Sequence, residues 1–496
     1  MIPRYEHPAI TSIWTDSAKL ARWDQVELAA IKARVRLGRV DMNDFEIIEG
    51  ALTANPVEAR VWKERERAIG HDLAAYVELR QEQLPKTLRY LFHQGLTSYD
   101  TEDPAFAVAL LQSSGVAITS LEGLRATLLR LALKYRYTPM LERTHGQWAR
   151  PASFGSRVLS WLAQLQEANE ALHIARDACM RSKLSGAIGT YSGGLSPEIE
   201  AKVLSTLGLK PFLGATQIVP RIVFARLAQA LELVAVAISN IAVDVELGAR
   251  SGYTLWQEPF GTQQKGSSAM PHKKNTIATE QMEGMARLAA GYTSAIVESA
   301  KSKERRDIAQ SCVERVAWPD LFHVVLRMLT TMTRVLGGMV VYPDAMLREL
   351  VDSRGTYAAE EAKVFLAEEL AKEGVVAEVA YRIVQYAAWN ALSPKGAWVK
   401  LRDEIAENLD EAEDALEEAR FAGANETLTT IEGIIGQGEL VWTDELAATS
   451  TTVLAWNQIL KRLFARTGVG NRWEKIFRMD FLLAGERTLF EHFIGD

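Results

Sequence analysis

The chain has 496 residues, of which 48% are apolar and 24% are charged, and its formal net charge is −7. These values are typical of a globular protein of about three domains with a large core. The acidic balance argues against a nucleic-acid-binding surface spread over the whole protein, but it leaves room for a local anion pocket. Two cysteines, Cys179 and Cys312, are too few for a disulfide framework or a metal cluster and suit a reducing compartment.

The N-terminus, MIPRYEHPAI, has no apolar segment of the kind found in signal peptides. The longest uncharged apolar stretches, such as the one from Leu233, are expected to be too short to span a bilayer. We therefore expect a cytoplasmic protein with no membrane partner and no nucleic-acid partner.

Along the chain, the helical signal dominates. Residues 1–100 are predicted to form short helices with breaks near Pro56, Gly70 and Gly95. Apolar periodicity then predicts long helices over about 105–135, 156–184, 278–303 and 319–340. A further apolar seam has residues spaced four and three apart: Leu227, Leu231, Val234, Ile238, Ile241 and Val245. Such a seam packs helix against helix and often continues into a subunit interface, and no alternating run of β-branched residues indicates a sheet.

These elements predict an all-α fold of three domains. We expect an N-terminal helical domain (1–104), a central long-helix bundle (105–345) and a C-terminal helical domain with an extended tail (346–496). In the last of these, residues 403–420 are strongly acidic and are expected to form a solvated helix face.

Four polar segments interrupt the helical pattern, and the densest is 261–276, GTQQKGSSAMPHKKNT. Its glycines favour a mobile loop. A serine without a base is a poor nucleophile, but a loop that closes over a substrate can place Lys273 and Asn275 beside a carboxylate on which negative charge develops. The alternative is a solvated surface loop, which the length and specificity of the pattern GSSxMPxKxN argue against.

Two other segments combine histidine with hydroxyl groups. RTHGQWARPASFG (143–155) contains His145, and a histidine in a loop is more often structural than catalytic. FHQGLTSYD (92–100) contains Thr97 and Ser98 and follows the pair His71-Asp72. By residue type alone, helix capping and turns are the favoured explanation of FHQGLTSYD and of His71-Asp72.

The fourth segment is ERRDIAQSCVER (304–315), which contains Arg306, Ser311 and Arg315. On a helix, Ser311 and Arg315 share one face and Arg306 can reach the same place from its start. Two guanidinium groups and a hydroxyl are well suited to bind a phosphate. A surface helix with salt bridges is the alternative explanation of this spacing.

The segment GSSAMPHKKN resembles the signature of the fumarase/aspartase superfamily, whose members perform anti β-elimination that releases fumarate or a related acid. The resemblance implies that Ser267 is the catalytic base, with Ser268 as the alternative. It further implies that Lys273 and Asn275 bind the substrate carboxylate. The family has proline after the asparagine, where this chain has Thr276.

Within that superfamily, RTHGQWARPASFG is similar to a segment of adenylosuccinate lyases. The resemblance makes His145 the general acid and Glu280 its carboxylate partner, which would raise the histidine pKa for protonation of the leaving nitrogen. Thr144 beside the histidine is a candidate substrate-binding residue. Arg150, Ala152 and Ser153 replace the usual Glu, Thr and Thr.

The same resemblance assigns substrate contacts to the remaining segments. Thr97 and Ser98 would bind the succinyl carboxylate, with His71 and Asp72 near the nucleotide. The 5′-phosphate would be bound by Arg4, Tyr5, Arg306, Ser311 and Arg315, while Gln217 contacts the substrate. The family implies no cofactor and no metal, and a homotetramer whose central bundles form the core and whose sites each draw residues from three chains.

The resemblance covers residues 1 to about 390 and keeps the order of the family's motifs. It departs where the nucleotide would bind. The family's QRDRH is Pro220–Phe224 here, and its SHSS is Ala309–Cys312. The C-terminal region is also some tens of residues longer than in the family.

The sequence therefore predicts a lyase that cleaves adenylosuccinate to AMP and fumarate, and succinylaminoimidazole carboxamide ribotide to its carboxamide and fumarate, in purine nucleotide biosynthesis. One alternative is another lyase or cycloisomerase of the superfamily that acts on a non-nucleotide succinyl, nitrosuccinyl or carboxymuconate substrate. The other is a non-catalytic helical assembly that retains only the fold.

Overall fold

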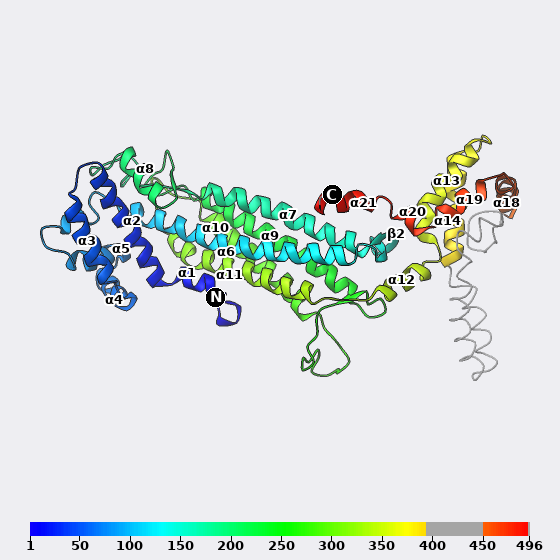
Figure 1. Ribbon diagram of the computed structural model, residues 1–496, viewed down its shortest axis with the longest axis horizontal. Coiled ribbons are helices and arrows are strands. Elements are labelled where there is room, and N and C mark those ends of the chain that lie inside the picture. The colour runs from blue at the N-terminus through cyan, green and yellow to red at the C-terminus, as the bar shows by residue number, and fades with distance from the viewer. Residues whose placement is uncertain (393–449, 495–496) are drawn as a thin grey trace. The chain divides into compact units, whose positions relative to one another are not determined.

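The computed structural model describes residues 1–392 and 450–494 (Figure 1), and these residues divide into two compact units. Unit 1 comprises Met1–Thr127, Trp161–Leu247 and Glu258–Gly338, and unit 2 comprises Leu128–Ser160, Gly248–Gln257 and Met339–Asp496. The predicted domain boundaries at 104 and 345 fall within helices α6 (Ser98–Lys134) and α12 (Pro343–Asp352). The three-domain division stays a prediction.

The first hundred residues form a cluster of helices in unit 1. These are η1 (Pro3–Tyr5), α1 (Pro8–Trp14), α2 (Asp16–Arg36), α3 (Met42–Ala54), α4 (Ala59–Ile69), α5 (Asp72–Glu82) and η2 (Arg89–Leu91). The Thr15 hydroxyl caps α2 by accepting the Ala18 amide at 3.1 Å. Gly70, with φ of 72°, ends α4. Trp23 and Tyr76 are among the large buried side chains of the core between these helices.

Long helices form the bundle that dominates unit 1 (Figure 1). They are α6, α7 (Phe154–Ala178), α9 (Ile222–Gly248), α10 (Ile277–Glu298) and α11 (Ala309–Gly337), and the shorter α8 (Pro197–Thr206) lies between α7 and α9 in the chain. The predicted seam lies on α9, and all six of its residues are fully buried. Helix α10 packs along α11. The prediction of a mostly helical, long-helix fold is confirmed.

Among the described residues, the chain also forms three two-stranded sheets, which the sequence pattern did not indicate. In them, β1 (Pro139–Thr144) pairs with β2 (Gln147–Ser153), β3 (Arg181–Ser182) with β4 (Lys210–Pro211), and β5 (Trp256–Gln257) with β6 (Val340–Val341). A strand of two residues is too short to show alternation. The β1–β2 hairpin is longer and carries His145 at its turn.

Unit 2 contains this hairpin and the C-terminal helices. These are α12, η3 (Thr356–Ala358), α13 (Ala359–Ala371), α14 (Ala377–Leu392), α18 (Ser450–Phe464), α19 (Val469–Lys475), α20 (Met479–Leu482) and α21 (Glu486–Ile494). Phe365, Ile383 and Trp473 belong to their shared core. The acidic segment 403–420 lies outside the described residues.

Two helices of the bundle are apolar over a long stretch. By length and composition alone, α6 and α9 could each cross a membrane, because both helices extend past the charged residues that bound their uncharged apolar stretches. However, 61% of the most apolar window of α9 and 50% of that of α6 are buried inside the protein. Helices that are buried on most sides become apolar all round for that reason.

Candidate active site

The signature loop lies between β5 and α10, and its own contacts give it a defined shape. A Cβ atom on Gly266 would lie 2.0 Å from the Lys273 carbonyl oxygen, so only glycine fits this close approach. Asn275 Nδ2 donates a hydrogen bond to the Gly266 carbonyl at 2.8 Å and closes the loop. Asn275 therefore has a structural contact in addition to its predicted role toward a substrate carboxylate.

The two serines of the loop differ in their surroundings. Ser267 is half-buried, and its Oγ accepts hydrogen bonds from the amides of Ala269 at 3.3 Å and Met270 at 3.1 Å. Two N–H donors stabilise negative charge on this oxygen and so favour loss of its proton. Ser268 and Lys273 are exposed. The geometry thus supports Ser267 over Ser268 as the candidate base.

Glu280 lies in the first turn of α10, exposed, beside other carboxylates. Glu258 caps the same helix, because it accepts the amide and the hydroxyl of Thr279, both at 2.7 Å. Burial, followed by the charges of Glu283, Glu280 and Glu258, raises the pKa of Glu246 to about 7. No sequence motif indicates Glu246 or Glu258 as a site residue. Such a group of carboxylates favours the protonated form of a histidine placed beside it.

His145 and Gly146 form the two-residue turn of the β1–β2 hairpin, with φ values of 53° and 76°. A turn with two left-handed residues matches the twist of the strands, but Asn, Asp or Gly is the usual choice at such positions. The hairpin therefore holds a histidine in a sparsely populated conformation at an exposed tip. Thr144 is the last residue of β1 and is exposed as well.

The hairpin is anchored to α12 in unit 2 by a buried carboxylate. Glu349, whose side chain is 0% exposed, forms an ion pair with Arg143 and accepts a hydrogen bond from Trp148 Nε1 at 3.0 Å. Arg150, which departs from the resembling family, pairs with Glu361 at 2.8 Å. His145 lies in unit 2 and Glu280 in unit 1, so their pairing stays a prediction.

At the start of α6, two candidate substrate-binding segments meet within unit 1. His71 Nε2 lies 3.5 Å from Ser98 Oγ. The other ring nitrogen of His71 accepts the Ala74 amide at 3.3 Å and caps α5, which is the structural role considered for it. The Thr97 amide donates to Asp100 Oδ2 at 2.9 Å, which fixes the backbone next to Ser98.

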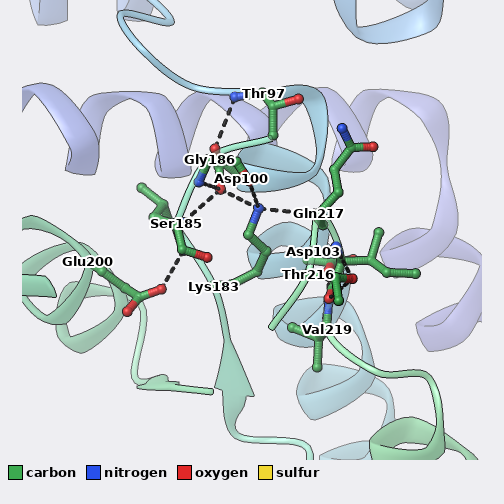
Figure 2. A network of polar contacts seen from close by, with 12 residues as sticks. Thr97, Asp100, Asp103, Lys183, Ser185, Gly186, Glu200, Thr216, Gln217 and Val219 are labelled. Atoms are coloured by element: carbon green, nitrogen blue, oxygen red, sulfur yellow. Dashed lines mark hydrogen bonds and ion pairs between the residues drawn. The ribbon is translucent and has the colours of Figure 1, made fainter. Parts of the chain in front are cut away.

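A buried ion pair connects this segment to Gln217, as Figure 2 shows. Lys183 Nζ lies 2.6 Å from Asp100 Oδ1, and both side chains are 0% exposed. The same ammonium group donates to the Gln217 carbonyl at 2.9 Å, while Asp100 also accepts the amide of Ser185 at 3.0 Å. Because unpairing either buried charge is costly, this contact sets the relative positions of the segments that carry Thr97 and Gln217.

The side chain of Gln217 meets Arg306. Arg306 Nη1 donates to Gln217 Oε1 at 2.7 Å, and its guanidinium carbon lies 4.1 Å from the centroid of the Tyr99 ring. The Tyr99 hydroxyl accepts a hydrogen bond from Gln310 at 3.3 Å. Gln310 stands where the resembling family has the histidine of SHSS. The replacing glutamine therefore has a hydrogen-bond partner, Tyr99, inside the protein.

Ser311 and Arg315 lie one turn apart on α11 and line a cavity of about 290 Å³ in unit 1. Arg315 Nη2 also lies 2.6 Å from Asp72 Oδ2. The structure thereby brings together three candidate nucleotide-binding residues that are up to 243 positions apart. The cavity wall also contains aromatic and charged side chains: Trp14, Lys19, Trp23, Trp62, Tyr99 and Glu102.

The N-terminal candidates Arg4 and Tyr5 lie in η1, which packs on α11. The amino group of Met1 pairs with Asp320 of that helix at 2.6 Å. Arg4 is exposed and Tyr5 is half-buried. Their convergence with the phosphate-binding candidates of α11 stays a prediction.

The arginine of the altered segment Pro220–Phe224 forms ion pairs inside the protein. Arg221 is buried and pairs with Asp103 at 2.8 Å and with Glu314 at 2.7 Å. The Asp103 carboxylate also accepts the Val219 amide at 2.7 Å. The arginine of this segment therefore stabilises the start of α9, and it also lines the cavity that Ser311 and Arg315 line.

Glu102 is a titratable group of the cavity that the sequence analysis missed. Burial, followed by repulsion from Asp72, raises its pKa to about 8 despite the nearby cations.

An unfolded glutamate ionises near pH 4.5, so the stability that protonated Glu102 contributes to the folded protein is complete below that pH and is lost as the pH rises to about 8. We expect Glu102→Gln to change the melting temperature little at pH 5 and to raise it by about 2 °C or more at pH 8–9. Thermal melts across this range test this, and an equal shift at every pH would contradict it.

Residues 50–291 match the family described as Lyase. The chain is 35% identical to the adenylosuccinate lyase of Thermotoga maritima over 394 residues, which are 79% of this chain and 89% of that protein. It is 36% identical to the adenylosuccinate lyase of Synechocystis sp. over 396 residues, which are 80% of this chain and 90% of that protein.

Among solved structures, the β-carboxy-cis,cis-muconate cycloisomerase of Acinetobacter calcoaceticus is similar, with a TM-score of 0.74. The likeness covers 99% of this chain and 98% of that one at 17% identity, and at this identity it shows the fold alone. The identity to the two lyases extends over most of their length. This chain therefore belongs to the adenylosuccinate lyase family of the fumarase/aspartase superfamily, and it is a lyase.

Proposed function

We propose that this lyase cleaves adenylosuccinate to AMP and fumarate, and succinylaminoimidazole carboxamide ribotide to its carboxamide and fumarate. The observation that carries the proposal is the match to adenylosuccinate lyases at 35–36% identity over 89–90% of their length. The direct test incubates the purified protein with each substrate and follows fumarate by its absorbance. Absence of fumarate from both substrates would overturn the proposal.

In the proposed reaction, Ser267 removes the proton from the carbon β to the leaving nitrogen. The two amides that donate to its Oγ reduce the energetic cost of the serine alkoxide. Lys273 and Asn275 then stabilise the carbanion, whose charge is delocalised into a carboxylate. An asparagine amide carries two N–H donors, so one remains for the substrate while the other holds the Gly266 carbonyl.

His145 would protonate the departing nitrogen, with Glu280 keeping its ring charged. The hairpin tip that carries His145 is exposed, and so is Glu280 in its own unit. Both are therefore accessible to other subunits of an assembly. We propose a homotetramer whose sites each combine residues of different chains.

An exposed apolar face of α9 supports this assembly. Leu233 is 50% exposed, Val236 45%, Val243 37% and Leu247 47%, at a spacing that places them on one side of the helix. An exposed group of apolar side chains of this kind marks an interaction surface. We expect self-association through the bundle, in the cytoplasm, with a nucleotide substrate and without a nucleic-acid partner.

Binding of the substrate phosphate should depend on the arginines of the fourth polar segment. Charge-assisted hydrogen bonds are worth roughly 1.5–3 kcal/mol each. We expect Arg306→Ala or Arg315→Ala to raise KM for adenylosuccinate by about tenfold or more. The neighbouring exposed Arg305 is the matched control, and Arg305→Ala should leave KM within about twofold. Equal effects of all three variants would argue against a specific phosphate site.

A non-nucleotide substrate is the second candidate function. One observation favours it: in the segment that departs from the family, Arg221 forms ion pairs with Asp103 and Glu314 inside the protein. The dephosphorylated nucleoside separates the two candidates. If it is cleaved as well as adenylosuccinate, the phosphate contributes nothing and the second candidate is preferred. The third alternative, a non-catalytic assembly, does not apply, because the chain is a lyase.

A further inference from the structure

Arg315, the candidate phosphate ligand of α11, shares a carboxylate with a second cation. Arg315 Nη2 lies 2.6 Å from Asp72 Oδ2, and Lys19 Nζ lies 3.4 Å from the same oxygen. Burial by itself raises the pKa of Asp72, but the charges of Lys19 and Arg315 outweigh it and keep the pKa below its usual value. The carboxylate is therefore ionised at neutral pH and has two counter-ions.

Lys19 is held at this carboxylate independently of Arg315. Its ammonium group lies 4.5 Å from the ring centroid of Trp23 and 5.0 Å from that of Trp62. Cation–π contacts of this kind position a lysine without neutralising its charge. Trp62 Nε1 in turn donates to the backbone carbonyl of Asp72 at 2.9 Å, so one indole contacts both members of the pair.

The three side chains differ in their freedom to move. Arg315 is 51% exposed, whereas Lys19 is 28% and Asp72 only 11% exposed. An anion that binds Arg315 and Ser311 must compete with Asp72 for the guanidinium. Because Asp72 stays buried when Arg315 turns away, it needs another cation, since an unpaired buried charge is strongly destabilising.

We propose that Lys19 is a positioning residue of the anion site, which retains Asp72 as its counter-ion when Arg315 moves to the substrate phosphate. The inference rests on the proposed function, because it takes the ligand of Arg315 to be the phosphate of the nucleotide. Lys19 acts through Asp72 and does not itself touch the phosphate. Removing Lys19 leaves Asp72 bound to Arg315 alone, and the anion must then break that pair without compensation.

Inorganic phosphate is the probe for this mechanism, with dissociation constants measured by calorimetry on the full chain. We expect Lys19→Met to weaken phosphate binding by about five- to tenfold, whereas Lys19→Arg should bind nearly as well as the unchanged protein. Asp72→Asn removes the competing charge but keeps an oxygen for the Leu73 amide, which Asp72 Oδ1 now accepts at 2.8 Å. It should bind phosphate at least as tightly as the unchanged protein.

The double variant Lys19→Met, Asp72→Asn is decisive. If Lys19 acts through Asp72, removal of the carboxylate restores phosphate affinity in the absence of the lysine. If the double variant binds as weakly as Lys19→Met, Lys19 contacts the anion directly or has a structural role, and the proposal is wrong. Unchanged binding by Lys19→Met would overturn it as well.

A matched control comes from the same helix, where the Lys32 ammonium lies 5.4 Å from the ring centroid of Phe45. Lys32→Met removes the same charge from a similar aromatic contact and should leave phosphate affinity unchanged. Circular dichroism checks that each variant is folded. If Lys19→Met binds phosphate normally while adenylosuccinate is still cleaved, only this inference is rejected. If the unchanged protein fails to bind phosphate or to cleave adenylosuccinate, the proposed nucleotide substrate is rejected as well.

Discussion

Replacement of Ser267 by alanine is expected to lower kcat for fumarate release by about 10²–10⁴-fold, because a positioned proton acceptor typically contributes this much. Substrate affinity should change little, since the change removes one oxygen and leaves Lys273 and Asn275 in place. The loop should also keep its shape, because the contact of Asn275 with the Gly266 carbonyl does not involve the serine side chain. Steady-state kinetics together with binding of AMP and fumarate would measure both effects.

Ser268→Ala is the matched control for this variant. Ser268 is exposed, whereas Ser267 Oγ accepts two backbone amides, so only the loss of Ser267 should affect the proton transfer. We expect the Ser268 variant to turn over within about threefold of the unchanged enzyme. The opposite result, with a normal Ser267 variant and an inactive Ser268 variant, would reverse the assignment and leave the elimination chemistry intact.

The helices could be predicted where burial follows a simple apolar period. The seam on α9 is the best example, because each of its six residues is fully buried. The start of helix α6 does not follow such a period, since the helix begins at Ser98 and not near 105. Its first turns contain Asp100 and Asp103, which are buried and satisfied by Lys183 and Arg221. Apolar periodicity cannot show that a charged residue occupies a buried helical position.

The motifs predicted which residues are candidates for the site, but not which residues they meet. Arg306 contacts Gln217, which is 89 positions away, and Asp72 contacts Arg315 across 243 positions. Such pairs depend on tertiary packing, on which a local spacing carries no information. For the same reason, no sequence signal identified Lys19 as the second counter-ion of Asp72.

Several candidate residues of the polar segments make structural contacts in addition to their predicted functions. His71 caps a helix, Asn275 closes a loop, and Gln217 holds Arg306. A structural contact is thus observed for each of these residues, and the functional role of each stays a prediction. Loss of activity in a variant therefore has to be compared with its stability before a chemical role is assigned.

If active sites are shared between subunits, mixing two inactive variants should restore lyase activity. His145 and Glu280 lie in different units of the chain, and the proposed tetramer brings the serine loop and the histidine hairpin of different subunits together. Ser267→Ala and His145→Ala should each lose about 10²–10⁴-fold in kcat when measured alone. After subunit exchange in an equal mixture, each site draws its serine and its histidine independently, so about a quarter of the sites should be intact.

The control for this restoration is a mixture whose two defects lie in the same loop. Ser267→Ala mixed with Lys273→Ala should stay inactive, because every site receives its whole signature loop from one chain, and both kinds of loop are defective. Native mass spectrometry with one variant carrying a tag shows whether mixed oligomers have formed. If mixed oligomers form but the serine and histidine variants do not restore activity together, each site takes both residues from a single chain. A gain of activity in the control mixture would show that the restoration does not come from complementary sites, because no site in that mixture has an intact loop.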